Sequence, residues 1–261
     1  MGRDNIDKIA QSADDRLLLA KLWDKIQAGI RKNIPANTCF LSPRELTLAD
    51  YLFDSTDGLS SFGGYTDAER KMLIYLPEYL DESYLSTDDS PIVCIQVKWS
   101  PQTTLTHRDF LGALMGAGIA RETVGDICVD KSGAVIFVTA EIASYLLENV
   151  TIVGRVKVSL QRICLAEAAI PSPELEVIRD TVASLRLDSL VSSGFRIGRN
   201  LAAQYISTGK AALDGLPCEK PDKPVPEGAK ISVRGLGKIR LAEINGKTKK
   251  DRISVTIHKY K

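Results

Sequence analysis

Lysine and arginine are the residues whose spacing in this chain points most directly to a chemistry. Residues 181–261 contain 16 of the 34 basic residues and only 7 acidic ones, a net charge of +9, whereas residues 1–180 carry −8. Each basic side chain near a phosphate releases condensed counterions, so a compact segment of this charge is typical of a polyanion binder, although a solvated basic face gives the same count. The charge confines the predicted phosphate chemistry to the C-terminal third.

The stretch 199–207 carries side chains suited to such contacts. At 100° per residue, one side of a helix there is apolar, with Leu201, Ala202, Tyr205 and Ile206, and the other is polar, with Arg199, Asn200, Ala203, Gln204 and Ser207. Arg199, Asn200 and Gln204 supply hydrogen-bond donors, and the small residues between them let a sugar–phosphate backbone come close. An ordinary amphipathic surface helix would have the same pattern.

Other chemistries find little support in the sequence. The chain has two histidines and five cysteines, and the cysteines form no CxxC pair, which argues against zinc ribbons, histidine-rich metal sites and disulfide frameworks. His107-Arg108-Asp109 resembles the kinase catalytic loop but lacks the accompanying glycine-rich loop, and Gly63-Gly64-Tyr65 lacks dinucleotide-binding spacing. We predict no catalytic residue, metal or cofactor, and we expect reduced, mostly buried cysteines.

The first of three predicted segments, residues 1–85, is expected to be mostly helical. Apolar residues recur at helical spacing over 19–30, and Ser42-Pro43-Arg44-Glu45 has the N-cap, proline and glutamate of a helix start. A turn and a further helix from Thr66 are expected next. The acidic stretch 81–91 is the predicted linker.

The second segment, residues 86–170, is expected to alternate strands and helices. Strands are predicted at 92–99, 126–130, 134–140 and 156–160, and helices at 106–115 and 141–150. The order β-α-β-β-α-β is that of the ferredoxin-like, RRM-like plait of many RNA-binding modules. The third strand lacks the aromatic RNA-recognition signature, so we predict a scaffold or a contact surface that does not stack bases.

The third segment, residues 181–261, is expected to hold two helices and a small antiparallel sheet. Leu187, Leu190 and Val191 form an apolar stripe on the first helix, which Gly194 is predicted to end. Strands are predicted at 210–213, 229–233, 238–244 and 252–258. The fold class is therefore α+β.

Three groups of residues in the third segment resemble the S4 RNA-binding domain. They are Leu185-Arg186-Leu187-Asp188 with Val191, Gly198-Arg199 with Ala202, Ile206, Gly209 and Lys210, and Ile231-Ser232-Val233-Arg234-Gly235. The resemblance implies an RNA-facing surface made by the two helices, with Arg186, Arg199 and Lys210 at basic positions and Asp188 as a structural acid. The chain departs from the pattern at Gly198, Asp214 and Ala229, and a carboxylate at Asp214 would repel phosphate.

The predicted RNA-binding surface combines these positions with the basic residues of the strands and loops. Its members are Arg186, Arg199, Asn200, Gln204, Lys210, Arg234, Lys238, Arg240, Lys249, Lys250 and Arg252. Because phosphate contacts fix position more than sequence, recognition is expected to depend on RNA shape.

Motifs along nearly the whole chain are similar to those of the bacterial YlmH family. They include Phe40 to Glu45, Gly63 to Lys71, His107 to Met115, Arg121 to Ile127 and Gly235 to Arg252. The resemblance implies binding to the large ribosomal subunit carrying a stranded peptidyl-tRNA, in ribosome-associated quality control. Gene neighbourhood links some members to cell division.

The sequence therefore predicts a non-enzymatic RNA-binding factor whose partners are the ribosome, its large-subunit rRNA and peptidyl-tRNA. The alternative is an S4-guided RNA-modifying enzyme, such as a pseudouridine synthase or methyltransferase, although residues 1–165 show no methyl-donor glycine motif. A cell-division-linked interaction protein is a weaker alternative. No apolar run of about 18 residues and no signal peptide are seen, so we expect a cytoplasmic protein with no membrane or DNA partner.

Overall fold

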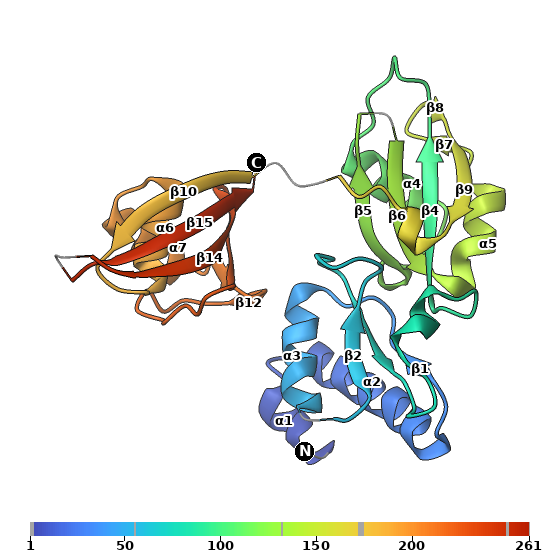
Figure 1. The fold of residues 1–261 in the computed structure, drawn as a ribbon, viewed down its shortest axis with the longest axis horizontal. Coiled ribbons are helices and arrows are strands. Elements are labelled where there is room, and N and C mark those ends of the chain that lie inside the picture. Colours follow the sequence, from blue (N-terminus) through green and yellow to red (C-terminus); the bar gives the residue numbers. More distant parts are fainter. Residues whose placement is uncertain (1–2, 55, 132, 172–174, 249–250, 261) are drawn as a thin grey trace. The chain divides into compact units, whose positions relative to one another are not determined.

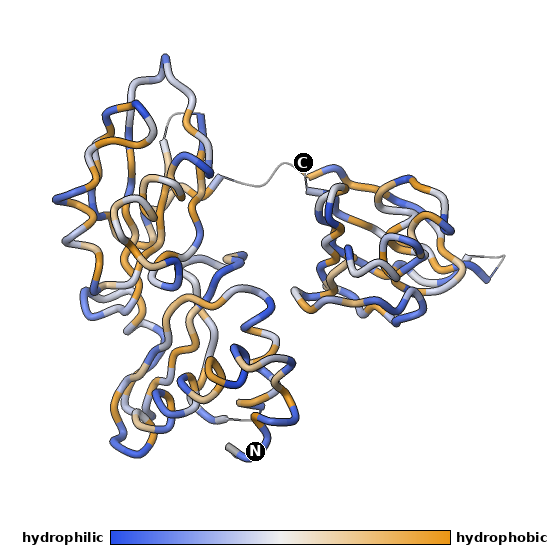
Figure 2. Tube along the Cα trace, turned by 180° about the vertical axis from the view of Figure 1, so that it is seen from behind, coloured by the Kyte–Doolittle hydropathy of each residue, from blue (hydrophilic) through white to orange (hydrophobic). Residues whose placement is uncertain are grey.

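A computed structural model describes residues 3–54, 56–131, 133–171, 175–248 and 251–260 of the chain (Figure 1). The chain divides into two compact units, residues 1–171 and 172–261, and each has its own hydrophobic core. Hydrophobic and hydrophilic stretches alternate along the chain in both units (Figure 2). The predicted boundary between residues 85 and 86 falls inside the first unit and stays a prediction.

The N-terminal part of the first unit combines helices with a small sheet. Helices α1 (Ile6–Ile9), α2 (Ala13–Lys32) and α3 (Pro43–Phe53) accompany an antiparallel sheet of order β1-β3-β2, made by Ala36–Asn37, Met72–Tyr75 and Leu59–Phe62. The helical spacing over 19–30 is confirmed within α2. The capping box predicted at Ser42 is also present, with Ser42 and Glu45 bonding each other's backbone N–H.

Two predictions for this part are wrong. Residues 66–69 form a turn before β3 instead of a helix, because Asp126 accepts hydrogen bonds from the backbone N–H groups of Glu69 and Arg70 at 2.7 and 3.1 Å. The stretch 81–91 is not a linker. It contains the 3-10 helix η2 (Glu82–Ser86), and the Leu85 side chain is buried in the core.

The second part of the first unit is a four-stranded antiparallel sheet with two helices. Its elements are β4 (Ile92–Lys98), α4 (His107–Gly116), β5 (Val124–Val129), β6 (Gly133–Thr139), α5 (Ala140–Asn149) and β9 (Ser159–Ile163), with the hairpin β7 (Ile152–Val153) and β8 (Val156–Lys157) before β9. The sheet order is β5-β6-β4-β9. Helices α4 and α5 pack against one face, where Val93, Ile95 and Ile136 are buried.

The opposite face of this sheet is covered by the N-terminal part. Phe40, Met72 and Ile74 are buried against Cys94 and Phe137. The Tyr65 and Phe137 rings stack with centroids 5.2 Å apart. Gly64, at φ +99°, permits this approach, since a Cβ there would lie 2.3 Å from the Phe137 ring. The glycine pair at 63–64 therefore serves packing and a turn.

The second unit is a six-stranded antiparallel sheet with two helices on one face (Figure 1). The strands are β10 (Leu175–Val182), β11 (Ala211–Leu213), β12 (Leu216–Pro217), β13 (Lys230–Val233), β14 (Gly237–Lys247) and β15 (Ile253–Tyr260), in the order β10-β15-β14-β13-β11-β12. Helices α6 (Leu187–Phe195) and α7 (Arg199–Ser207) pack on its buried residues, including Ile231, Ile239 and Ile257.

Three details of this unit differ from the predictions. Strand β10 was not predicted, and it pairs with β15 over its whole length. Gly194 does not end α6: the helix continues to Phe195, Arg196 takes the left-handed conformation, and Gly194 lies where a Cβ would meet Ile239 at 2.6 Å. Leu201 is 44% exposed instead of facing the core.

The five cysteines are free thiols, as predicted, but only Cys94 is fully buried. Cys39, Cys128 and Cys218 are partly buried, and Cys164 is exposed, because it follows the last strand of the four-stranded sheet. The expectation of mostly buried thiols is therefore wrong for Cys164.

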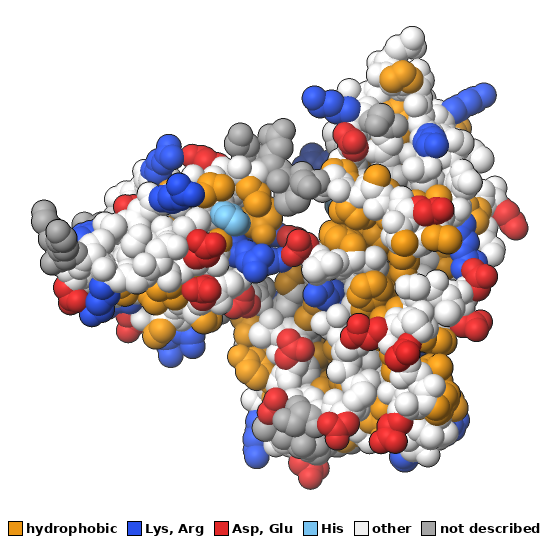
Figure 3. All heavy atoms as spheres, viewed as in Figure 1, with side chains coloured by type: hydrophobic (Ala, Val, Ile, Leu, Met, Phe, Trp, Pro, Cys, Tyr) orange, Lys and Arg blue, Asp and Glu red, His pale blue; other side chains and the backbone are white. Residues whose placement is uncertain are grey.

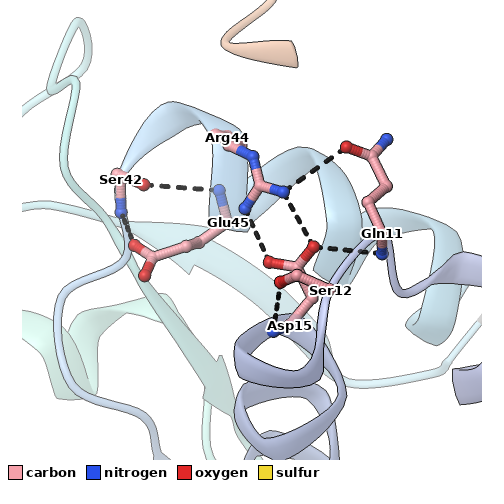
Figure 4. A network of polar contacts seen from close by, with 6 residues as sticks. All are labelled: Gln11, Ser12, Asp15, Ser42, Arg44 and Glu45. Atoms are coloured by element: carbon pink, nitrogen blue, oxygen red, sulfur yellow. Dashed lines mark hydrogen bonds and ion pairs between the residues drawn. The ribbon is translucent and has the colours of Figure 1, made fainter. Parts of the chain in front are cut away.

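An ion pair joins α2 to α3 (Figure 4). The two carboxylate oxygens of Asp15, which is 4% exposed, each accept a bond from Arg44 at 2.7 Å. Ser12 caps α2, and Gln11 contributes a backbone bond to the same carboxylate. The Arg44 hydrogen bonds lower the pKa of Asp15 from 3.8 to about 2.

Replacing Arg44 with Met is expected to lower the free energy of unfolding at pH 7 by about 1–2 kcal/mol, as the shifted pKa implies. Because the folded-state pKa lies below the unfolded value, this stabilisation is present above pH 3.8 and is lost as pH falls toward about 2. The difference from the parent should therefore shrink across that window. Urea unfolding followed by Trp23 fluorescence measures it, since Trp23 lies in α2.

The matched control is Arg16→Met, which removes an exposed ion pair with Asp7. Its effect should stay below about 0.5 kcal/mol, the usual range for surface pairs. An Arg44→Met loss that is equal at pH 6 and pH 3 would contradict the assignment of Asp15.

Candidate RNA interface

The predicted basic residues lie on two different faces of the second unit. In β14 and β15 the buried residues Ile239, Leu241 and Ile257 point toward α6 and α7. Side chains alternate along a strand, so Lys238, Arg240 and His258 point to the opposite face. The structure therefore separates Lys238 and Arg240 from the helix-borne residues Arg186, Arg199, Asn200 and Gln204.

Asp188 organises the basic residues on the face of the sheet that α6 and α7 cover, which we call the helix side. The residue is 5% exposed, and its carboxylate accepts hydrogen bonds from Arg199 at 3.0 and 3.2 Å and from Arg186 at 3.3 and 3.5 Å. The side chains of Arg186 and Arg199 are 42% and 49% exposed, so each guanidinium faces both the buried acid and solvent. One carboxylate thus holds two arginines side by side at the start of α6 and α7.

The electrostatics of this cluster favour an ionised Asp188. Burial opposes ionisation, but the hydrogen bonds and positive charges of Arg199 and Arg186 outweigh it, so the pKa of Asp188 lies below its ordinary value. Each guanidinium has five N–H donors, and Asp188 uses the Nε and Nη2 donors. The remaining donors suit a phosphate.

The polar side of α7 continues this surface. Asn200 and Gln204 are exposed, as the helical spacing predicts. Lys210 is also exposed, and its Nζ lies 5.2 Å from the centroid of the Tyr205 ring. The backbone N–H of Arg234 donates to the carbonyl oxygen of Lys210 at 2.8 Å, so these two basic residues are neighbours.

The other predicted residues have different surroundings. The Arg252 guanidinium bonds Thr181, with Nε 3.0 Å from Oγ1 and Nη2 donating to the carbonyl oxygen. It thus ties the residue before β15 to the end of β10. The Nε of Arg240 is buried, with no hydrogen-bond partner among the described residues. Lys249 and Lys250 lie outside the residues that the structure describes.

Asp214 belongs to a turn, with φ +48° beside Gly215 at φ +81°. Its Oδ1 accepts a hydrogen bond from the backbone N–H of Lys230 at 2.8 Å. The carboxylate that was expected to repel phosphate therefore also stabilises the backbone between β11 and β13.

A basic hollow of about 340 Å³ lies beside this surface and was not predicted. It is lined by Arg196, Arg199 and Arg252, by one acid, Asp180, and by hydroxyl side chains from α6 and β10. Arg196 is 72% exposed and pairs with Glu176 at 2.8 Å. Sequence analysis missed Arg196 because its position depends on β10, which supplies Glu176 and Thr181.

The described residues of the first unit leave no open face of the four-stranded sheet on which bases could stack. RNA-recognition plaits stack bases on the face opposite their helices. Here Phe40, Tyr65 and Met72 occupy that face over Phe137. Among the described residues, no group of three His, Cys, Asp or Glu side chains could hold a metal ion.

Comparison with known proteins decides the family. Residues 86–167 match the family described as "Putative RNA-binding domain in YlmH". The chain is 35% identical over 226 residues to the Ribosome-associated protein quality control protein P2 of Bacillus subtilis (strain 168), covering 86% of this chain and 87% of that protein. The chain belongs to the YlmH family.

A solved structure agrees with this assignment. The Cell division protein ylmH from Streptococcus pneumoniae matches with a TM-score of 0.50 and 27% sequence identity, over 62% of this chain and 98% of that chain. The resemblance to the YlmH family is thus confirmed, and so is the α+β class of this family member. No described helix of the chain is both long and apolar enough to cross a membrane.

Replacing Asp188 with Asn is expected to lower the free energy of unfolding of the second unit by about 1–3 kcal/mol, because a buried acceptor of two charged donors loses its charge. Far-UV circular dichroism during urea unfolding measures this, since both tryptophans, Trp23 and Trp99, lie in the first unit.

Asp222→Asn is the control, because it makes the same chemical change at an exposed aspartate. Its effect should stay within about 0.5 kcal/mol. Equal stability of the two variants would show that Asp188 does not organise the arginine pair.

Proposed function

We propose that this protein is a non-enzymatic RNA-binding factor that binds the large ribosomal subunit in ribosome-associated quality control. The observation that carries the proposal is the arginine pair held by Asp188 at the start of α6 and α7. A buried acid fixes Arg186 and Arg199 before any ligand arrives, which reduces the entropy lost on binding. Asn200, Gln204, Lys210 and Arg234 extend the surface along α7 and the adjoining turn.

The relatives support the ribosome as partner. One is named for ribosome-associated quality control, and the matched family is described as RNA-binding. We propose that the second unit is an S4 domain that contacts rRNA and peptidyl-tRNA through its helix side. Phosphate contacts dominate such a surface, so shape determines the site more than sequence does. Action on ribosomes places the protein in the cytoplasm.

We further propose that residues 86–170 form an RRM-like plait with an unusual role. The observed order β5-β6-β4-β9, with both helices on one face, supports the plait. The N-terminal part of the first unit covers the face of the plait on which bases would stack. Any RNA contacts made by the plait would therefore use its loops or edges. The plait then acts mainly as a scaffold.

Charge reversal of Arg199 and Lys210 to Glu is expected to abolish sedimentation with large subunits in a sucrose gradient of bacterial lysate, because both positions would then repel phosphate. Since Arg199→Glu also removes a partner of the buried Asp188, circular dichroism must first show that the variant is folded. Lys21→Glu with Lys32→Glu changes the net charge equally at exposed positions of α2 and should leave sedimentation unchanged. Sequencing of the associated RNA should recover tRNA with the large subunits. Sedimentation of the Arg199 and Lys210 variant like the parent would refute the helix-side site.

Salt dependence gives an independent test of the same surface. Several phosphate contacts should weaken binding to purified large subunits more than about tenfold between 50 and 200 mM salt. A smaller change would argue against a phosphate-based interface. If the protein instead stays at the top of the gradient with a free RNA, a modified nucleotide in that RNA would favour the RNA-modifying alternative.

A further inference from the structure

The sheet of the second unit has a second face that the helix-side interface does not use. Helices α6 and α7 cover one face, and no other described helix covers the opposite one. Figure 3 looks onto this open face, where a histidine borders hydrophobic and basic side chains. The residues there come from β10, β15, β14 and β13.

Side chains on the open face form two parallel rows across the strands. In the first row, Leu175 of β10 is opposite Tyr260 of β15, and the Nζ of Lys238 of β14 lies 5.7 Å from the Tyr260 ring centroid. The second row follows the register Val177, His258, Arg240. Each row thus runs from an apolar residue through an aromatic ring to a cation.

The apolar ends of the rows are exposed to solvent. Leu175 is 37% exposed and Val177 is 53% exposed, which is high for aliphatic residues on adjacent positions of a sheet face. Tyr260 and His258 are half-buried. Lys238 lies over the Tyr260 ring, and both aromatic residues keep part of their surface exposed beside aliphatic neighbours. A planar base can stack on the exposed part of such a ring.

Positive charge surrounds the rows. Lys230 is opposite Arg240 on β13, and Arg179 follows Val177 on the same face of β10. Acidic side chains also appear on this view of the unit (Figure 3). Among the described strand residues, Glu243 bonds Thr256 beyond the two rows. The charge around the aromatic rings therefore complements a phosphate backbone.

Spacing distinguishes a single strand from a duplex. Tyr260 and His258 are two positions apart on β15, about 6.8 Å at the usual rise per residue. This is about twice the 3.4 Å separation of stacked bases in a helical strand. The two rings therefore fit bases of an extended, unpaired strand better than neighbouring bases of a duplex.

We propose that this open face binds an unpaired RNA strand, with bases on Tyr260 and His258 and phosphates at Lys238, Arg240 and Lys230. The face is separate from the Asp188 cluster, so the protein could hold structured RNA with its helices and a single strand with its sheet. The proposal shares RNA binding with the proposed function but does not depend on the ribosome as partner.

The test measures binding of the full chain to a labelled oligouridylate of about 12 nucleotides by fluorescence anisotropy, within the usual site range of such surfaces. Tyr260→Ala and His258→Ala should each weaken binding at least about fivefold, because each removes one stacking ring. Tyr260→Phe keeps the ring and should bind within about twofold of the parent. Circular dichroism confirms that each variant is folded.

Controls separate this face from the helix side. The Arg199→Glu, Lys210→Glu variant should retain oligouridylate binding within about threefold even where it loses the ribosome. A duplex of equal length should bind more weakly than the single strand and should respond little to Tyr260→Ala. An acidic peptide, polyglutamate, should not displace the oligonucleotide at equal charge concentration.

Four outcomes would overturn the proposal. They are unchanged binding in both alanine variants, a Tyr260→Phe variant as weak as Tyr260→Ala, loss of oligonucleotide binding in the Arg199 and Lys210 variant, and equal competition by polyglutamate. The last would identify the face as a site for acidic peptides. Failure of ribosome sedimentation with intact oligonucleotide binding would refute the proposed function and leave this inference standing.

Discussion

When helices cover one face of a sheet, the other face must either be buried or remain solvated. The two units of this protein differ in this respect. In the first unit, Phe40, Tyr65 and Met72 bury the second face over Phe137. In the second unit, strands β10 to β15 leave it open to solvent. Burial of apolar area stabilises the first arrangement, whereas the open face carries enough charge to remain solvated.

Hydrogen bonds between polar groups hold the two parts of the first unit together. Asp126 accepts bonds from Tyr65 and from the backbone of residues 69–70, and Arg70 donates to the carbonyl oxygens of Val124 and Phe40. Burial, followed by the charge of Asp126, raises the pKa of Tyr65 and keeps its hydroxyl a donor. Residues that carry the family resemblance thus serve the fold of this unit.

The second unit holds two partly exposed arginines around one buried acid. Asp188 costs free energy to bury, and Arg186 and Arg199 offset that cost. The same contacts hold both guanidinium groups in place at the surface. One carboxylate therefore fixes both exposed arginines of the proposed RNA interface. Elsewhere, the basic side chain of Arg252 is bonded to Thr181.

Local patterns in the sequence determined most helices and strands: the periodicity over 19–30, the capping box at Ser42, and α7 at 199–207. The helix predicted from Thr66 failed because a carboxylate distant in sequence takes its backbone N–H groups. Strand β10 was missed because its pairing partner, β15, lies some seventy residues later, and only that pairing makes it a strand.

The sequence by itself determined the charge of the C-terminal third, the family and the types of residue available to contact phosphate. Only the tertiary structure decided which of them act together. It placed Lys238 and Arg240 on the face opposite Arg199, committed Arg252 to Thr181 and paired both helix-side arginines with Asp188. The physical reason is that side-chain direction and ion pairing follow from strand register and packing, which depend on contacts between residues far apart in the chain.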